Sequence, residues 1–209
     1  WVPSTDLVQP QRGWQAAFGY FKNFRDNDFE FSVETYYKEL NNQIDYAENY
    51  VNDPTQDLED QFVFGDGKAY GLEFFLRKRN GKLNGWLSYT LSRTERTFDD
   101  INDGNIFPAI QDRPHDLSIA MSYKINPKWQ ISGSFVYTSG ITFTPVESIY
   151  LLEQSVSYQF GDRNSARIEP YHRFDLSARL TPKQRKENGL RSSWTFSIYN
   201  LYDRRNLLF

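Results

Sequence analysis

The residue types of a hydrolase site come closest together at His115, Asp116 and Ser118. In serine hydrolases a nucleophilic serine, a histidine base and an orienting carboxylate come from separate parts of the chain and meet in space. Here His115 and Asp116 are sequence neighbours at the start of an expected strand, and no motif for a nucleophile elbow accompanies them. We therefore predict no catalytic site and expect that the chain is not an enzyme.

Oxygen ligands gather between residues 99 and 104, where three Asp and one Asn lie close together, as they do in a calcium loop. Such a loop needs a bidentate Glu at its twelfth position, but that position falls on Ile110 or Gln111. The chain has no Cys, which excludes thiolate metal sites and disulfides. No metal site and no cofactor are predicted, and the stretch is expected to be a solvated loop.

Seven charged residues alternate with apolar residues along expected strands: Glu30, Glu34, Glu73, Arg77, Arg173, Asp175 and Arg179. An Arg or Lys that faces lipid at the middle of a membrane costs about 2–4 kcal/mol. The alternation therefore predicts that these side chains line the water-filled or plugged inside of a barrel. Their expected role is to hydrate the lumen and to pair across strands or with a plug, and direct contact with a passing substrate is the alternative.

Aromatic residues in the long polar stretches form a second set of candidates: Tyr46, Tyr50, Phe107, Phe143 and Tyr150. Exposed aromatic side chains often supply binding energy at recognition sites. We therefore predict that these five residues contact an extracellular ligand.

The composition narrows the class of protein. The 209 residues are 39% hydrophobic, and the mean hydropathy of -0.70 alone would suggest a soluble protein, but 17% are aromatic. A transmembrane barrel gives this combination, because only one face of each strand is apolar and aromatic rings gather at both membrane interfaces. No run approaches the ~18 apolar residues of a membrane helix. The net charge of -3 argues against nucleic-acid binding, and any export signal is expected to lie outside this sequence.

Alternation with a period of two is the strongest pattern. Between residues 29 and 38, for example, Phe29, Phe31 and Val33 alternate with Glu30 and Glu34. Strands of this kind are predicted at 13–22, 29–38, 68–79, 82–97, 114–125, 128–138, 170–180 and 190–201. The chain is therefore expected to be all-β.

Short and long connections alternate between these strands. The short ones lie at 23–27, Asn80-Gly81, Asn126-Pro127 and 182–189, and the long polar ones lie at 39–67, 98–113 and 139–169. Outer-membrane barrels have short periplasmic turns and long extracellular loops. The pattern thus predicts an antiparallel transmembrane β-barrel segment. Both ends of the chain would then be extracellular, as expected of a piece of a larger barrel.

Six stretches, taken in order, carry a family resemblance: 7–11, 34–38, 70–74, 85–92, 112–117 and 199–206. Among them, Gly85-Trp86-Leu87-Ser88-Tyr89-Thr90-Leu91-Ser92 and Asp112-Arg113-Pro114-His115-Asp116-Leu117 are the most specific. Over essentially the whole chain, their order and spacing resemble the C-terminal barrel region of TonB-dependent outer-membrane receptors. One departure is Gln11, which stands where the family usually has Glu.

The resemblance implies that residues 1–209 supply about eight consecutive strands of a ~22-stranded barrel, with the plug domain and the closing strand outside this chain. It implies active import of a scarce extracellular ligand with TonB-coupled energy at the outer membrane of a Gram-negative cell. The implied partners are outer-membrane lipid and lipopolysaccharide, the receptor's own plug and the TonB inner-membrane energy complex, with a surface lipoprotein as a further candidate. Siderophore, cobalamin, glycan and peptide importers share this wall, so the ligand is left open.

Three other classes of protein remain as alternatives. A passive outer-membrane porin would have the same wall without a plug, and a stand-alone eight-stranded structural or adhesion barrel would fold by itself. A soluble β-sandwich would bury its apolar face in a shared core. Regular strands with long loops at one end only disfavour the sandwich.

Overall fold

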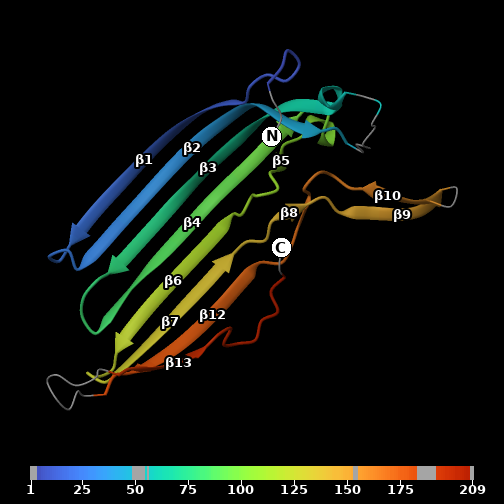
Figure 1. Cartoon of the computed structure of the whole chain (residues 1–209). Coiled ribbons are helices and arrows are strands. Elements are labelled where there is room, and N and C mark those ends of the chain that lie inside the picture. Colours follow the sequence, from blue (N-terminus) through green and yellow to red (C-terminus); the bar gives the residue numbers. More distant parts are fainter. Residues whose placement is uncertain (1–3, 49–54, 56, 153–154, 183–191, 208–209) are drawn as a thin grey trace.

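The wall of the molecule is one antiparallel sheet whose strand order follows the chain. The computed structural model describes residues 4–48, 55, 57–152, 155–182 and 192–207, and within them the main path runs β1-β2-β3-β4-β6-β7-β12-β13 (Figure 1). The strands are β1 (Arg12–Phe24), β2 (Phe29–Tyr46), β3 (Phe62–Lys78), β4 (Leu83–Phe98), β6 (His115–Lys124), β7 (Trp129–Thr138), β12 (Tyr171–Leu180) and β13 (Trp194–Ile198). A strand thus forms at each predicted position. Among the described residues, no helix is both long and apolar enough to cross a membrane.

The register gives the sheet two chemically different faces. Cross-strand partners share a face, and one continuous row of partners is Phe31, Leu76, Leu87, Ile119, Phe135 and Phe174. We call this side the apolar face. A row on the other side is Glu34, Glu73, Thr90, Asp116, Thr138 and Tyr171, and we call that side the polar face.

The first long connection is shorter than predicted, because β2 continues through a bulge. The stretch 39–67 was expected to be a loop, but β2 continues to Tyr46 and β3 begins at Phe62. The register shifts between Leu40 and Gln43, with Asn42 at φ 55°. Past that shift, Gln43 and Asp45 join the polar face although they are odd-numbered, so strict alternation could not reveal the strand extension.

The other two long connections are also more ordered than expected. The stretch 98–113 contains η2 (Asn102–Gly104) and β5 (Phe107–Pro108), and 139–169 contains β8 (Thr142–Phe143), β9 (Val146–Leu152), β10 (Ser155–Phe160) and β11 (Ala166–Arg167). Phe98, Ile101 and Phe107 are almost fully buried against one another, with Val63 packed beside them. The solvated loop expected at 99–104 is confirmed for Asp99, Asp100 and Asp103, which are exposed, but Ile101 is buried because the apolar residues of the stretch fold back onto the polar face of the sheet.

The end of the described chain is held by a side chain in place of a strand. β13 ends at Ile198, earlier than predicted. Beyond it, the side-chain oxygen of Asn206 accepts a hydrogen bond from the backbone N–H of His172 (3.1 Å). The side-chain nitrogen of Asn206 donates a hydrogen bond to the backbone carbonyl of His172 (3.0 Å). Asn206 therefore replaces a partner strand at this point of β12.

Asp28 joins two neighbouring short turns. Its carboxylate accepts hydrogen bonds from Lys78 Nζ (2.5 Å) and from the backbone N–H of Asn80 (2.8 Å). Its carbonyl accepts one from the N–H of Arg79 (2.8 Å). The bond from Lys78 is the main reason that the pKa of Asp28 lies below its ordinary value of 3.8.

The bulge predicts a backbone penalty at Asn42. We expect Asn42→Val to lower the free energy of unfolding by about 1–2 kcal/mol, because a β-branched residue is strained at positive φ. Asn42→Gly is the control, since it accepts this φ and loses the same hydrogen bond to the carbonyl of Pro10. Urea unfolding followed by tryptophan fluorescence measures both, and equal stability of the two variants would contradict the assignment.

The short-turn contact predicts an acid-dependent loss of stability. The pKa of Asp28 is lowered in the folded state, so its contribution is complete above 3.8 and is lost as the pH falls through the lowered folded-state value. Asp28→Asn should flatten the pH dependence of unfolding in this range. Asp26→Asn, in the same turn, is the control, and parallel pH profiles of wild type and Asp28→Asn would refute the linkage.

Candidate functional site

Charged side chains on the polar face form the first part of the candidate site. All seven residues predicted to line a lumen lie on this face: Glu30, Glu34, Glu73, Arg77, Arg173, Asp175 and Arg179. The structure brings them onto one surface because the strand register is continuous across the sheet. Their role toward a ligand stays a prediction.

Some of these charges are paired and others are not. Arg79 donates to Glu30 at 2.7 Å, and Arg173 contacts Asp175 at 3.0 Å. Glu34 lies directly opposite Glu73, and within the described ranges neither has an ion-pair partner. Like charges that face each other across strands are destabilising unless water screens them. The arrangement thus favours a wet polar face.

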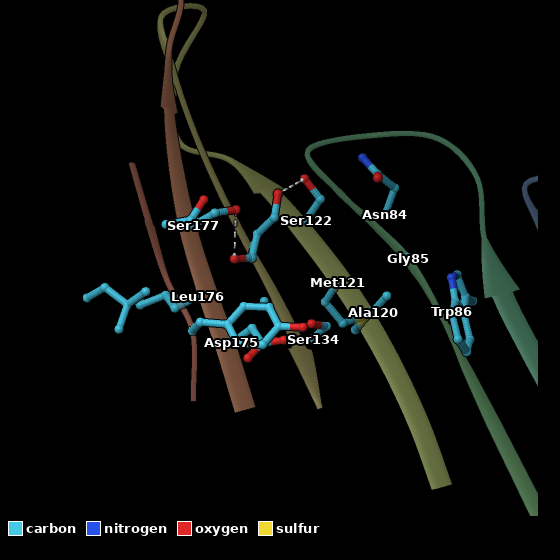
Figure 2. Close-up of a pocket in the computed structure, with 15 residues that line it drawn as sticks. Asn84, Gly85, Trp86, Ala120, Met121, Ser122, Ser134, Asp175, Leu176 and Ser177 are labelled. Atoms are coloured by element: carbon cyan, nitrogen blue, oxygen red, sulfur yellow. Dashed lines mark hydrogen bonds between the residues drawn. The ribbon is translucent and has the colours of Figure 1, made fainter. Parts of the chain in front are cut away.

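Small polar side chains leave a hollow on the polar face of β4, β6, β7, β12 and β13. Its volume is about 480 Å³, and Figure 2 shows Ser122, Ser134 and Asp175 around it. One lining row is Asn84, Ser122, Ser132, Ser177 and Ser197, and the next is Trp86, Ala120, Ser134 and Asp175. Tyr199, which follows β13, also lines the hollow. The hydroxyls of Ser122 and Ser132 lie 3.0 Å apart. Alternation predicted the side on which several of these serines lie, but it carried no signal for the hollow itself.

Asp175 lines this hollow, and Arg173 contacts Asp175 from outside the lining at 3.0 Å. Its guanidinium lies 4.0 Å above the ring of Tyr199 and donates to the hydroxyl of Tyr171 at 3.1 Å. The second carboxylate oxygen of Asp175 accepts the N–H of Asn200 at 2.9 Å. Several contacts therefore hold the Arg173 guanidinium and the Asp175 carboxylate in fixed positions. The electrostatic potential that this part of the polar face presents is fixed with them.

A buried ion pair joins the long connections above the sheet. The side chain of Asp112 is 0% exposed and contacts Arg167 Nη2 at 2.5 Å. It also accepts the backbone N–H of Thr94 in β4 at 2.7 Å. The other terminal nitrogen of Arg167 donates to the carbonyls of Asp112 and Gly140. Stretches 98–113 and 139–169 are thus fastened to each other and to the wall.

Arg163 makes a second fastening, nearer the strand ends. Its guanidinium contacts the carboxylate of Asp45 at 3.1 Å and the carbonyl of Tyr46 at 2.9 Å. Its backbone N–H donates to the side chain of Asn102 at 2.7 Å, and that side chain donates back to the carbonyl of Arg163 at 3.2 Å. Sequence reasoning singled out neither Arg163 nor Arg167. The partners are far apart in the chain, and no local pattern marks them.

The predicted ligand-contacting aromatics have different environments. Phe107 is 3% exposed and lies in the buried cluster with Phe98, so the expectation that it is exposed to a ligand is wrong. Tyr46 follows the bulge onto the apolar face and packs on Phe62, with ring centroids 5.2 Å apart. Phe143 and Tyr150 are 42% and 45% exposed. Tyr50 lies outside the described residues.

The remaining candidates do not form reactive sites. His115 lies on the apolar face and Asp116 on the polar face, so they point away from each other. His115 Nδ1 instead lies 2.8 Å from the hydroxyl of Tyr89. In the 99–104 stretch, the side-chain amide of Asn102 forms hydrogen bonds with the backbone of Arg163. No cluster of His, Asp and Glu that could hold a metal ion occurs in the described part of the chain.

Comparison with known proteins identifies the family to which this two-faced sheet belongs. The profile of the family described as TonB dependent receptor-like, beta-barrel, matches residues 2–201. The chain belongs to this family. Among curated proteins none is significantly similar to this TonB-dependent receptor-like barrel.

Solved structures agree on the barrel fold. The ferripyoverdine receptor of the outer membrane of Pseudomonas aeruginosa is 15% identical, with a TM-score of 0.64 over 94% of this chain and 24% of that chain. For the FrpB iron transporter of Neisseria meningitidis, the identity is 15% and the TM-score 0.60 over 96% of this chain and 28% of that one. The present TonB-dependent receptor-like chain thus spans about a quarter of the length of these structures, and at this identity the likeness shows the fold alone.

The buried ion pair predicts a large effect of Arg167. We expect Arg167→Met to lower the free energy of unfolding of the region above the sheet by about 3–5 kcal/mol, because Asp112 would keep a buried charge without its partner. Faster proteolysis within 98–113 and 139–169 should accompany this loss. Arg163→Met is the matched control, since its contact with Asp45 is partly exposed. Equal protease sensitivity of both variants would argue against a special role of the buried pair.

Proposed function

We propose that this chain is the C-terminal part of the barrel of an outer-membrane receptor that binds a scarce extracellular ligand and imports it with TonB-coupled energy. In this proposal, the protein is a transporter without enzymatic activity. The apolar face contacts lipid, and the polar face contacts water and a plug supplied by the rest of the receptor. The observation that carries the proposal is the unbroken apolar row from β2 to β12, set within a family of receptor barrels.

Aromatic pairs at both ends of the apolar face support a membrane position. Near the long-connection end, the rings of Tyr37 and Tyr70 stack at 6.5 Å, and Tyr137 stacks on His172 at 6.3 Å. Near the short turns, Phe24 stacks on Phe29 at 5.1 Å. The amphipathic Tyr rings suit headgroup depth, whereas Phe24 and Phe29 are wholly apolar and belong to the hydrocarbon side of that boundary. The spacing of these pairs along the strands is therefore consistent with an apolar band between two interfaces.

The long connections are the proposed extracellular part. If the short turns are periplasmic, the Arg163 and Arg167 fastenings lie at the outer mouth, where ligand arrives. Phe143 and Tyr150 are exposed aromatics there, as are Tyr158 and Phe160, and Phe143 and Tyr150 are the proposed ligand contacts. The seven charged residues of the polar face then line the lumen below. The proposed partners are outer-membrane lipid, lipopolysaccharide, the plug, the TonB energy complex and a surface lipoprotein.

A growth and uptake experiment tests energised import. A strain with the full-length gene deleted should grow poorly when iron, cobalamin or a glycan is limiting, and the limiting nutrient that reveals the defect indicates the ligand class. Uptake of that radiolabelled nutrient by wild-type cells should stop when a protonophore collapses the proton gradient. Binding to the cell surface should persist, because capture precedes the energised step.

The porin alternative gives the opposite result. Passive diffusion through an open barrel continues without a proton gradient and does not depend on TonB. Protonophore-insensitive uptake would therefore defeat the active-transport proposal, while leaving the barrel fold intact. A TonB-deleted strain provides the matched control, since it keeps the receptor and loses only the coupling.

A further inference from the structure

Cations collect at the short-turn end of the polar face, on β6 and β12. Lys124 and Arg179 lie in one cross-strand row, on either side of Gln130 of β7. Lys82 adjoins this row, because its carbonyl accepts the backbone N–H of Lys124 at 2.7 Å. We call Lys82, Lys124 and Arg179 the cationic row. All three residues are exposed, and within the described ranges none of them has an ion-pair partner.

The β2 and β3 side of the same end balances its cations with carboxylates. Lys78 contacts Asp28 at 2.5 Å, and Arg79 and Arg77 contact Glu30 at 2.7 and 4.0 Å. Beside the cationic row there is no such counter-charge among the described residues. The next row toward the middle of the sheet has only neutral side chains: Asn84, Ser122, Ser132, Ser177 and Ser197. The cationic row therefore differs from the rest of this end in being unbalanced.

Charge on this strip of the polar face is concentrated in the last row. On β4, β6, β7 and β12, the four rows above it contain three charged residues, Asp116, Arg173 and Asp175. Arg173 and Asp175 form an ion pair with each other. The sequence 183–191, which connects β12 to β13, has four cations and one Glu, so it adds positive charge on balance. Because opposite charges attract, an anion on this strip is most stable at the short-turn end.

Hydroxyl donors adjoin the cationic row. Gln130 Nε2 donates a hydrogen bond to Ser122 Oγ, and Ser122 Oγ lies 3.0 Å from Ser132 Oγ. Whichever of the two serines donates in that contact, one of their two hydroxyl hydrogens stays available for an acceptor outside the pair. An anionic group at the cationic row therefore finds a neutral donor in the row above it.

We propose that the cationic row and the serines above it bind a carboxylate or phosphate group of the imported solute, where the solute leaves the lumen for the periplasm. The inference rests on the proposed function, which makes the polar face the lumen wall and the short turns periplasmic. It narrows the imported ligand to anionic solutes. Guanidinium and ammonium groups form charge-assisted hydrogen bonds with such oxygens. Lys124 and Arg179 start two strands apart, about 10 Å, and their long side chains can converge over Gln130.

The position of the row favours a solute in the lumen over a membrane lipid. Lys124 and Arg179 are next to Tyr123 and Leu180, which lie on the apolar face, so the cations point away from hydrocarbon. Like charges on neighbouring strands destabilise a sheet, and a bound anion removes this repulsion. A carboxylate of the plug is the competing occupant. It would hold the row permanently and exclude an added anion, so the two occupants give opposite results in a binding experiment.

Equilibrium dialysis of the full-length receptor in a neutral detergent tests the site. Radiolabelled pyrophosphate and citrate are the probes, since one presents phosphate and the other carboxylate groups, and glycerol is the neutral comparison. We expect saturable binding of at least one of the two anions and none of glycerol. The triple variant Lys82→Gln, Lys124→Gln, Arg179→Gln should bind at least about tenfold more weakly, because each lost charge-assisted hydrogen bond is worth about that factor.

The triple variant Lys22→Gln, Lys38→Gln, Lys68→Gln is the matched control, because it removes the same charge elsewhere. Lys22 and Lys68 lie on the apolar face, and Lys38 lies at the other end of the polar face, so binding should be unchanged. A further variant, Ser132→Asp, keeps the three cations and adds a carboxylate beside them, and it should also weaken binding. Heat-modifiable migration on gels checks that each variant is folded.

Three results would overturn the proposal: no saturable binding of either anion to wild type, as a plug carboxylate in the row would give, unchanged binding by the cationic-row variant, or an equal loss in the control variant. These outcomes are separable from failure of the transport proposal. A receptor that binds the anion but takes up nutrient without a proton gradient contradicts active import alone. A receptor that imports actively but binds neither anion contradicts the anion site alone.

Discussion

The pairing register of the strands is the constraint on which the rest of the structure depends. Backbone N–H and C=O groups in contact with hydrocarbon have to be bonded to another strand, and each bonded pair fixes which face its side chains occupy. A slip of one residue between β3 and β4 would place Phe74 and Leu76 on the polar face and Glu73 and Arg77 on the apolar face. Because this coupling runs through every adjacent pair, one apolar face and one polar face extend across the whole sheet.

The sheet could be predicted from the sequence because its information is local. Phe31 and Glu34 reveal their faces by their spacing alone, and Asn80-Gly81 marks its turn. Prediction failed where that period breaks. The bulge at Asn42 moves Asp45 to the polar face, so the continuation of β2 was read as loop. Asn206, which takes the place of a strand beside His172, has no periodic signature either.

The region above the sheet was harder to predict because its contacts join distant segments. Phe98, Ile101 and Phe107 have no alternation that distinguishes a buried cluster from exposed loop aromatics. The link between Arg167 and Asp112 spans 55 residues of sequence. Of the candidate site, the charged residues of the polar face were therefore predictable from the sequence. Arg163, Arg167 and the serine-lined hollow were not, because they depend on contacts between segments that are far apart in the chain. Burial of apolar side chains and pairing of charges act in both regions. Only in the sheet do they produce a repeating sequence pattern from which the structure can be predicted.

The paired fastenings have a consequence for receptor engineering and for natural recombination. Stretches 98–113 and 139–169 are anchored to each other through Asp112, Asn102, Arg163 and Arg167, so neither is an independent module. If only one of them were transplanted into a homologous receptor, its carboxylate or guanidinium would be left without the partner that the other stretch provides. Specificity in such receptors should consequently be exchanged in blocks that carry both stretches, and crossover points that separate them should be rare among viable chimaeras.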